Sequence, residues 1–398
     1  MRIAIWHNLP SGGGKRALYD QVRALVAHGH SVTAWCPDTA NRSFLPLQTL
    51  IEERCLPTGL ATAQATGLAR LSMEVRTKRA MTLHARACAS EIREGGFDIL
   101  LAHACRFYHS PHIGRYVDVP AVLYLQEPKR GLYEWLPRLP WPAAFPSEGL
   151  KERMKLPLKV YFARRLVRDE IMNARAFRRI LCNSYFSREN IARAYGLDAH
   201  VCYLGVDTDI FLPLINSAPK PSVICVGAFI PAKDPELLVR AVALLPSPRP
   251  VLNWFANHVD DSLSQEMQEL ARSLRVELHL HQLASDRDLV AALNSSSLLA
   301  YAPRLEPFGY APLEANACAI PAVGVREGGV RETINHEETG ILTERDPASL
   351  AEGMSRLLAD GELRRALGKK ARDTVMANWT LEAASARLIR QLEAVLAQ

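Results

Sequence analysis

Short runs of apolar residues alternate with stretches of helical period through the first half of the chain. The predicted strands are 2–7, 31–36, 97–102 and 121–126, and the predicted helices are 15–28 and 68–94. Gly29 follows the first helix as a stop signal, and the apolar positions of that helix are Leu18, Val22, Leu25 and Val26. Because strands alternate with helices, we expect a parallel sheet covered by helices, with this apolar face packed on the sheet.

The same alternation restarts after a proline-marked stretch at 213–221. The predicted strands are 222–227, 251–256, 276–281 and 297–302, and the predicted helices are 235–245, 261–274 and 286–294. A chain of 398 residues also exceeds the roughly 250–300 that one core usually supports.

We therefore predict an α/β protein of two Rossmann-like, doubly wound domains, at 1–210 and 211–379. A final helix at 380–398 can pack back on the first domain. Ligands of such sheets bind outside the carboxyl ends of the strands, so two domains that face one another create a cleft for them.

A proline-rich stretch at 128–157 interrupts the alternation and predicts an irregular insertion, either a lip for an acceptor or membrane, or a plain surface excursion. The following residues are basic, since 151–179 holds ten Lys/Arg against three Asp/Glu. This basic stretch suits anionic lipid or a phosphorylated acceptor, and equally a solvated helix face.

Composition narrows the class of protein. The chain is 48% hydrophobic and 23% charged, which is ordinary for a globular protein and excludes disorder. Its eight cysteines show no C-x2-C pairing and lie mostly in apolar runs such as 180–182 and 223–226, as buried reduced thiols do. The chain opens directly into a strand and contains no 18-residue apolar run, so we expect a cytoplasmic protein, at most peripheral on the inner face of the membrane.

The segment 304–314, RLEPFGYAPLE, carries the strongest chemical signal. Glu306 lies at the carboxyl end of a predicted strand and Glu314 on the helix that follows. The amides at the start of that helix offer unpaired N–H groups and a positive dipole end, which suit phosphate and sugar oxygens. A plain helix start with acidic residues favoured by the dipole is the alternative.

Two further turns suit anions. Lys233 stands just before a helix that begins near Pro235, after a strand that ends in Gly227. The triplet 12–14, GGG, follows the first strand and lets backbone approach a bound group closely. The alternatives are a solvated lysine and a flexible turn.

Taken together, these segments resemble family 4 glycosyltransferases with the GT-B fold, and the resemblance runs nearly end to end. The shared segments, in order, are the glycine-rich first loop with LVAHGHSV, NSYFSRENIARAYG, YLGVDTDIF, VGAFIPAKDPELL, RLEPFGYAPLEANACAIPAV and REGGVRETINHEETGIL. The resemblance implies a retaining enzyme that moves a hexose-type sugar from a nucleotide-diphosphate sugar to a saccharide or lipid-linked acceptor. It implies neither a metal nor a cofactor, and we expect no nucleic-acid partner.

The resemblance also implies roles for individual residues. Glu306 and Lys233 are the expected catalytic residues, Glu306 on donor-sugar hydroxyls and Lys233 on the leaving diphosphate, while Glu314 binds the ribose. The remaining donor-binding residues are Gly13, Gly14, Arg304, Phe308, Gly309, Tyr310 and Ala311, and those expected on the acceptor side are Gln126, Glu127 and Arg130.

Three positions depart from the family pattern. Ala228 stands where the family commonly has an arginine, so half of a phosphate clamp is missing unless Arg304 or Arg16 replaces it. Gln126 stands where a histidine is often found, and Ala319 where a glycine is expected before a proline.

Two rival functions remain open. Residues 12–17 formally fit the dinucleotide fingerprint G-x-G-x-x-A, with Asp38 after the second strand, although the first glycine does not directly close its strand. A P-loop is excluded, because Arg16 replaces the Ser or Thr that would hold magnesium. The other rival is a non-catalytic GT-B scaffold that binds carbohydrate, which Ala228 and Gln126 would favour.

Overall fold

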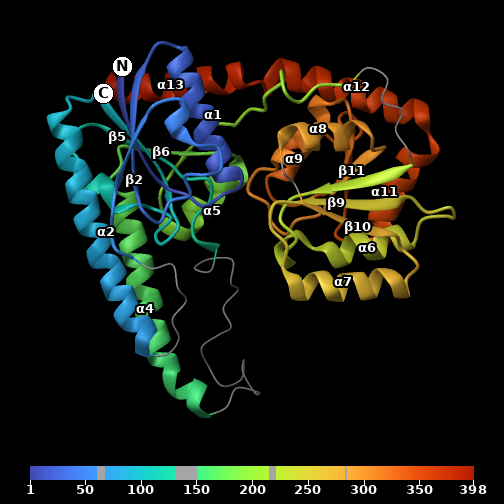
Figure 1. The fold of residues 1–398 in the computed structure, drawn as a ribbon, viewed down its shortest axis with the longest axis horizontal. Helices are drawn as coiled ribbons and strands as arrows, with labels where there is room; N and C mark the ends of the chain where they lie inside the picture. The colour runs from blue at the N-terminus through green and yellow to red at the C-terminus, as the bar shows by residue number, and fades with distance from the viewer. Residues whose placement is uncertain (61–67, 131–149, 215–220, 283–284) are drawn as a thin grey trace. The chain divides into compact units, whose positions relative to one another are not determined.

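The computed structural model describes residues 1–60, 68–130, 150–214, 221–282 and 285–398. The chain forms two compact units. Unit 1 comprises Met1–Tyr203 with Ser385–Gln398, and unit 2 comprises Leu204–Ala384 (Figure 1).

Unit 1 is built on a parallel sheet of seven strands in the order β3-β2-β1-β4-β5-β6-β7. The strands are β1 Arg2–Asn8, β2 Ser31–Pro37, β3 Glu52–Leu56, β4 Ile99–Cys105, β5 Ala121–Tyr124, β6 Arg179–Cys182 and β7 His200–Val201. The order reverses between β1 and β4, and ligands of open α/β sheets bind at such a switch point. The glycine triplet follows β1 and therefore lies at this point.

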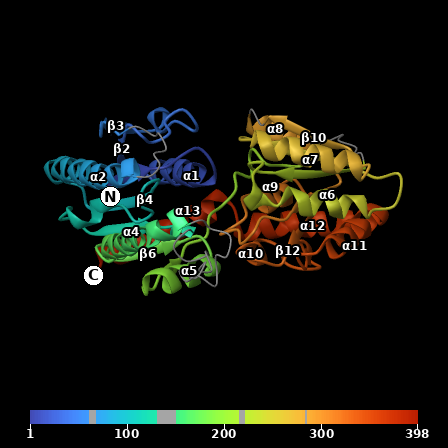
Figure 2. The ribbon, with the colours of Figure 1, turned by 90° about the horizontal axis from the view of Figure 1, so that it is seen from below.

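The helices of unit 1 cover its sheet. They are α1 Gly13–Ala27, α2 Leu68–Glu94, α4 Leu150–Ala174, α5 Tyr185–Tyr195 and α13 Leu381–Leu396, of which the part from Ser385 belongs to this unit. An ion pair of 2.6 Å between Lys78 and Asp169 joins α2 and α4, which run alongside one another in Figure 1 and are seen from below in Figure 2.

The first helix packs as its pattern predicts at three positions of four. Leu18, Val22 and Leu25 are fully buried, whereas Val26 is 39% exposed, so the prediction for Val26 was wrong. Val26 lies in the last turn, where the chain leaves the sheet, and Gly29 then turns it back with φ of 76°.

Unit 2 repeats the design with six parallel strands in the order β10-β9-β8-β11-β12-β13. The strands are β8 Ser222–Val226, β9 Val251–Ala256, β10 Leu278–Gln282, β11 Leu298–Tyr301, β12 Ala322–Val325 and β13 Gly340–Thr343. The helices are α6 Pro235–Ala243, α7 Asp261–Ser273, α8 Asp286–Asn294, α9 Tyr310–Ala317, α10 Val330–Thr333, α11 Pro347–Ala359 and α12 Gly361–Asn378. The switch point here falls between β8 and β11.

The core of unit 2 explains why its strands β8, β11 and β12 read as unbroken apolar runs. Side chains of β8, β9, β11 and β12 pack with those of α6, α7, α11 and α12 in one buried cluster. Val223 and Val323 are fully buried in it. Strands covered by helices on both faces bury every side chain, so alternation disappears from the sequence.

Two further details differ from the sequence-based prediction. The strand β3 was not predicted, because Glu52–Leu56 is a charged edge strand rather than an apolar run. The predicted irregular stretch 128–157 overlaps α4, since residues 150–157 are helical, and the rest of it at 131–149 lies outside the described residues. The helical stretch therefore extends back through Pro157, at the loss of one backbone hydrogen bond.

The cysteine prediction is confirmed. All eight cysteines are free, and seven are buried while Cys55 is half-buried. In the part of the chain that the structure describes, no helix is both long and apolar enough to cross a lipid bilayer.

Candidate functional site

The turns after β8 and β11 bring together the two residues with the clearest chemical signal. Lys233 ends a short 3-10 turn, Pro231–Lys233, and its Nζ lies 2.6 Å from Oε2 of Glu306 in the loop after β11. Their side chains are 22% and 19% exposed, so solvent reaches both. The pair therefore sits at the switch point of unit 2, where a ligand is expected.

The residues around Lys233 explain its placement. Gly227 has φ of 135°, and a Cβ there would lie 3.6 Å from Cε of Lys233, so the lysine stem runs directly over this glycine. On the other side, Nζ lies 6.0 Å from the ring centroid of Tyr301, the last residue of β11. The Lys233 side chain thus runs along the end of the sheet, and its ammonium lies beside Glu306.

A second ion-pair group fixes these turns. Asp234, which has φ of 51°, accepts from Arg304 and Arg345 at 2.8 Å each. Arg345 also pairs with Glu327 at 2.8 Å and donates to the carbonyls of Ala302 and Pro303. The sequence reasoning missed Arg345, although a charged residue just beyond the carboxyl end of a buried strand is the signal that could have found it.

Arg304, expected as a replacement for the missing clamp arginine, lies beside the lysine turn. Its guanidinium bonds Asp234, the residue after Lys233, and its side chain is 60% exposed. Arg304 thus stands next to the lysine with most of its surface in solvent, while Arg16 belongs to unit 1.

The GGVRE segment packs backbone against backbone on the Glu306 loop. The amide of Gly329 donates to the carbonyl of Glu306 at 2.7 Å. A Cβ on Gly328 would lie 2.4 Å from that carbonyl oxygen, and one on Gly329 would lie 2.2 Å from the carbonyl oxygen of Pro307. Only glycine permits this approach, so the two glycines position the loop that carries Glu306.

The helix α9 begins immediately after this loop. Gly309 is the N-cap residue, with φ of 103°, and as a glycine it offers no side chain of its own as a cap. The first helical residues are Tyr310 and Ala311, whose N–H groups lie where the helix dipole is positive. Glu314 lies one turn further on and is 5% exposed. The buried ring of Phe308 packs against the rings of Tyr310 and Trp379.

In unit 1 the predicted glycine turn and the predicted acceptor-side residues meet. A Cβ on Gly14 would lie 3.6 Å from Oε1 and 3.7 Å from Nε2 of Gln126, which follows β5. Gly12 adopts φ of 129° at the start of the turn. Residues more than one hundred positions apart therefore form one surface at the switch point of the first sheet.

The neighbours of Gln126 are held by hydrogen bonds. The hydroxyl of Ser187 donates to the carbonyl of Gln126 at 2.6 Å. Arg130 donates to the carboxylate of Glu127 at 2.6 Å, and the Glu127 carbonyl lies 3.1 Å from Nδ1 of His109. Burial lowers the pKa of His109. The three expected acceptor-side residues thus lie together.

The structure does not present Asp38 as a dinucleotide site would. Its carboxylate accepts from the hydroxyl of Thr58 at 2.6 Å and from the amides of Thr58 and Gly59. Three residues also separate the end of β1 from Gly12. Asp38 therefore caps a turn with its carboxylate and does not present it to a ribose, as the acid after the second strand does in dinucleotide enzymes.

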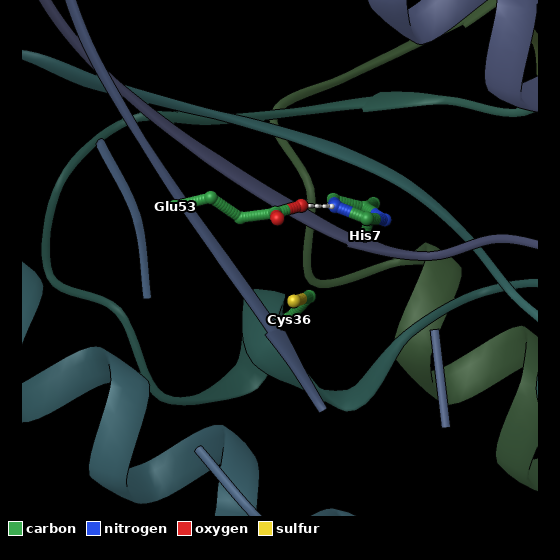
Figure 3. A group of neighbouring side chains, drawn as sticks. All are labelled: His7, Cys36 and Glu53. Atoms are coloured by element: carbon green, nitrogen blue, oxygen red, sulfur yellow. Dashed lines mark hydrogen bonds and ion pairs between the residues drawn. The ribbon is translucent and has the colours of Figure 1, made fainter. Parts of the chain in front are cut away.

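The described residues contain one group with the donor atoms of a metal site, which sequence spacing could not reveal. His7, Cys36 and Glu53 come from β1, β2 and β3, and their ligand atoms lie within 4.8 Å of one another (Figure 3). Two cations already face the carboxylate, since Arg42 donates to it at 2.9 Å and the Lys15 amine lies 3.9 Å away. Burial also raises the pKa of Cys36 well above that of a free thiol, which opposes the thiolate a metal needs.

Comparison with known proteins assigns the family. The model of Glycosyltransferase Family 4 matches residues 11–210, and the model of Glycosyl transferases group 1 matches residues 206–374. Together they span both units, as the resemblance read from the sequence implied.

Curated relatives match parts of the chain. An N-acetyl-alpha-D-glucosaminyl L-malate synthase of Bacillus anthracis is 33% identical over 32% of this chain and 32% of its own length. A GDP-mannose-dependent alpha-(1-6)-phosphatidylinositol monomannoside mannosyltransferase of Mycobacterium tuberculosis is 28% identical over 52% of this chain and 59% of its own. The chain therefore spans less than two thirds of the length of either relative.

Solved structures match the chain over its whole length. Anabaena HepE, solved in complex with UDP-glucose, is 16% identical with a TM-score of 0.73, over 99% of this chain and 100% of that one. The sucrose-phosphate synthase of Thermosynechococcus elongatus is 18% identical with a TM-score of 0.72, over 99% of each chain. At this identity the likeness shows the fold alone, and it confirms the predicted GT-B fold with two Rossmann-like domains. Family model, fold and ordered motifs agree, and the chain belongs to glycosyltransferase family 4.

Proposed function

We propose that this protein is a retaining hexosyltransferase that moves a sugar from a nucleotide-diphosphate sugar to a saccharide or lipid-linked acceptor. The observation that carries the proposal is the Lys233–Glu306 pair at the switch point of unit 2, directly before the start of α9. A cation, a carboxylate and the amides at a helix start lie at one sheet edge. They match the groups of a nucleotide sugar, which are a diphosphate, hydroxyls and further phosphate oxygens.

In this proposal the chain stabilises the leaving group without a metal. Negative charge grows on the diphosphate as the glycosidic bond breaks, so a preformed ammonium and amide dipoles lower the barrier most. Lys233 supplies the ammonium and the amides of Tyr310 and Ala311 the dipoles. Glu306 both holds Lys233 and accepts from hydroxyls of the donor sugar, while Glu314 binds the ribose.

The acceptor side falls to unit 1. The glycine turn at Gly13 and Gly14 lets backbone approach a donor phosphate or the acceptor, and Gln126 lies against Gly14. The amide of Gln126 both donates and accepts hydrogen bonds, which suits a hydroxyl. Glu127 and Arg130 carry opposite charges beside it and bind further polar groups of the acceptor.

The proposal extends to an anionic membrane surface, since lipid-linked acceptors lie there. The described part of α4 has a groove whose lining includes Arg164 and Arg168 together with Val167 and Ile171. Met172, in the same groove, is 40% exposed. Arginines interleaved with apolar side chains match anionic headgroups above an acyl layer, so we place the protein peripherally on the inner face of the membrane.

The lipid contact is tested by sedimentation with vesicles of phosphatidylcholine, with and without phosphatidylglycerol. The double variant Arg164→Gln with Arg168→Gln should weaken binding to the anionic vesicles by roughly 30-fold, at about 1 kcal/mol per arginine. The matched double variant Arg272→Gln with Arg287→Gln, on the exposed faces of α7 and α8, should bind as wild type does. Equal binding by both double variants would remove the membrane from the proposal.

The transferase itself is tested by a donor-hydrolysis screen over UDP, GDP and ADP sugars without acceptor. A transferase slowly passes the sugar to water, so we expect release of nucleoside diphosphate from at least one donor and its loss in Glu306→Gln. A protein that binds a nucleotide sugar tightly but releases none, even with acceptor saccharides added, would instead be the non-catalytic scaffold.

A further inference from the structure

The first turn of α1 directs a lysine into the core instead of into solvent. Lys15 has a fully buried side chain, and in the described residues its Nζ has no hydrogen-bond partner. The amine lies 3.9 Å from Oε1 of Glu53 on β3. Nothing in the family resemblance or in the proposed roles uses this lysine.

Glu53 is the centre of a buried charge cluster. Its Oε1 accepts from Nε2 of His7 at 3.0 Å, and its Oε2 accepts from Arg42 at 2.9 Å and from Gln48 at 3.0 Å (Figure 3). Burial opposes ionisation of the carboxyl, but these bonds and the charge of Lys15 outweigh it and hold the pKa of Glu53 at about 2. Glu53 is therefore an anion at neutral pH.

The other members of the cluster have complementary states. Burial lowers the pKa of His7 to about 4, so the ring is neutral and Nε2 carries the proton that it donates to Glu53. Burial also lowers the pKa of Lys15, and the Glu53 anion opposes this shift. Lys15 thus depends on Glu53 for compensation of its buried charge.

A buried charge of this kind is a poor source of stability. Ion pairs in a core often contribute no more than well-packed apolar side chains would, because each ion loses its hydration. A methionine would fill the same space at less cost. A charged pair instead favours one geometry, because the attraction between the two charges depends on the distance between them.

The geometry of the Lys15–Glu53 pair constrains the glycine turn. The amides of Lys15 and Arg16 both donate to the carbonyl of Gly12 at 3.1 Å, so the lysine and the turn are one hydrogen-bonded loop. Gly12 and Gly13 have no side chains with which to hold their own position. Gly14, next to Lys15, packs on the side-chain amide of Gln126.

We propose that Lys15 is a positioning residue, whose buried ion pair with Glu53 holds the backbone of residues 12–14 against Gln126. This inference rests on the proposed function, in which that turn meets a donor phosphate or the acceptor. Lys15 acts through the turn and touches no substrate. The attraction between Glu53 and Lys15 fixes the orientation of the amides in the first turn of α1.

The test compares Lys15→Met with Lys15→Arg and with Lys78→Met. Methionine keeps the apolar stem and removes the charge, whereas arginine keeps the charge. Lys78 is the control, a half-buried lysine on α2 that pairs with Asp169 on α4. For each variant, amide hydrogen exchange of residues 12–16, the unfolding midpoint, and kcat and KM of donor hydrolysis are measured.

We expect Lys15→Met to speed exchange of the 12–16 amides at least tenfold and to lower kcat at least tenfold. Lys15→Arg should restore most of both, and Lys78→Met should change neither. Unchanged exchange in Lys15→Met would overturn the inference, whatever the activity does. So would stoichiometric zinc in the purified wild-type protein that is lost in Cys36→Ser, because the cluster would then hold a metal. If wild type hydrolyses no donor, the proposed function fails while the exchange data still decide the role of Lys15.

Discussion

Lys233 and Glu306, 73 residues apart in sequence, meet with 2.6 Å between Nζ and Oε2 at the switch point of the second sheet. Each charge compensates the other before any substrate binds. A bound diphosphate would compete with Glu306 for the Lys233 ammonium. The Glu306 carboxylate could then accept hydrogen bonds from sugar hydroxyls. In the proposed function the pair thus couples leaving-group binding to sugar binding.

The two carboxylates should differ kinetically. Glu306→Gln weakens both the hold on Lys233 and the contact with the donor sugar, where bonding changes on the way to the transition state, so it should mainly lower kcat. Glu314→Gln, one turn into α9, should mainly raise KM for the donor, because ribose contacts stay constant through the reaction. Steady-state donor hydrolysis separates the two, and indistinguishable defects would contradict the roles assigned.

Lys233→Ala should remove the side-chain cation that faces the diphosphate, since Ala228 offers none. Loss of a comparable oxyanion partner costs roughly 3–4 kcal/mol, so kcat should fall about 100- to 1000-fold. If Arg304 or Arg16 also neutralises the diphosphate, kcat should fall less than tenfold in Lys233→Ala. The Arg→Ala change at that arginine should then lower kcat more. Unaltered turnover and donor affinity in all three variants would refute the diphosphate site.

Gly329→Ala should disable the Glu306 loop. The added Cβ would lie 2.2 Å from the carbonyl oxygen of Pro307, so the loop must shift and lose the Gly329–Glu306 hydrogen bond. We expect kcat to fall at least tenfold and the melting temperature to drop. Gly361→Ala at the start of α12 is the control, because its Cβ would meet only arginine tips at 3.4 and 3.7 Å. Equal effects of both changes would argue against a specific packing role.

Buried neutral histidines should make the fold sensitive to acid. Burial lowers the pKa of His112 to about 4 from 6.5, although Asp169 opposes the shift, and in the described residues neither ring nitrogen has a hydrogen-bond partner. As pH falls from about 6.5 to about 4 the unfolded chain takes up the proton first. The contribution of neutral His112 to stability, fully present above pH 6.5, is therefore lost progressively through this window.

His112→Phe removes that titration and keeps a ring against Tyr108, whose centroid lies 4.5 Å away. Between pH 7 and pH 4 the variant should lose about 3 kcal/mol less stability than wild type, since the pKa difference is 2.5 units. Urea unfolding at the two pH values measures this. A wild-type slope in His112→Phe would show that His112 is not buried as described, and His200→Phe, at an exposed site on β7, serves as the control.

The sequence predicted the alternation of elements well because buried parallel strands leave long apolar runs. It also predicted Lys233 and Glu306 as site residues, since charged side chains at strand ends stand out against such runs. Gln126 was predicted only through the family resemblance. It did not predict the strand β3, whose letters EERCL read as polar surface. Glu53 lies on this strand and was therefore missed as well. In the sequence it reads as an exposed carboxylate, and only the fold surrounds it with cations.

Pairings across long sequence separations were also beyond the pattern. Arg345 reaches Asp234 and Glu327 only because β13 ends beside β12, an order that no local periodicity encodes. The glycines at 328 and 329 were recognised as part of a motif, but their reason is a contact of 2.2–2.4 Å with another loop. Sequence thus indicated which residues matter more readily than what each one touches.

The central claim is that this chain cleaves a nucleotide sugar with retention and without a metal. The most direct measurement is proton NMR of donor hydrolysis by protein treated with EDTA, recorded early enough to see the first anomer formed. From an α-linked donor we predict release of nucleoside diphosphate together with the α-sugar, at a rate that EDTA leaves largely intact and that Glu306→Gln abolishes. Appearance of the β-sugar first, or complete loss of cleavage on chelation with recovery on added manganese or magnesium, would contradict it.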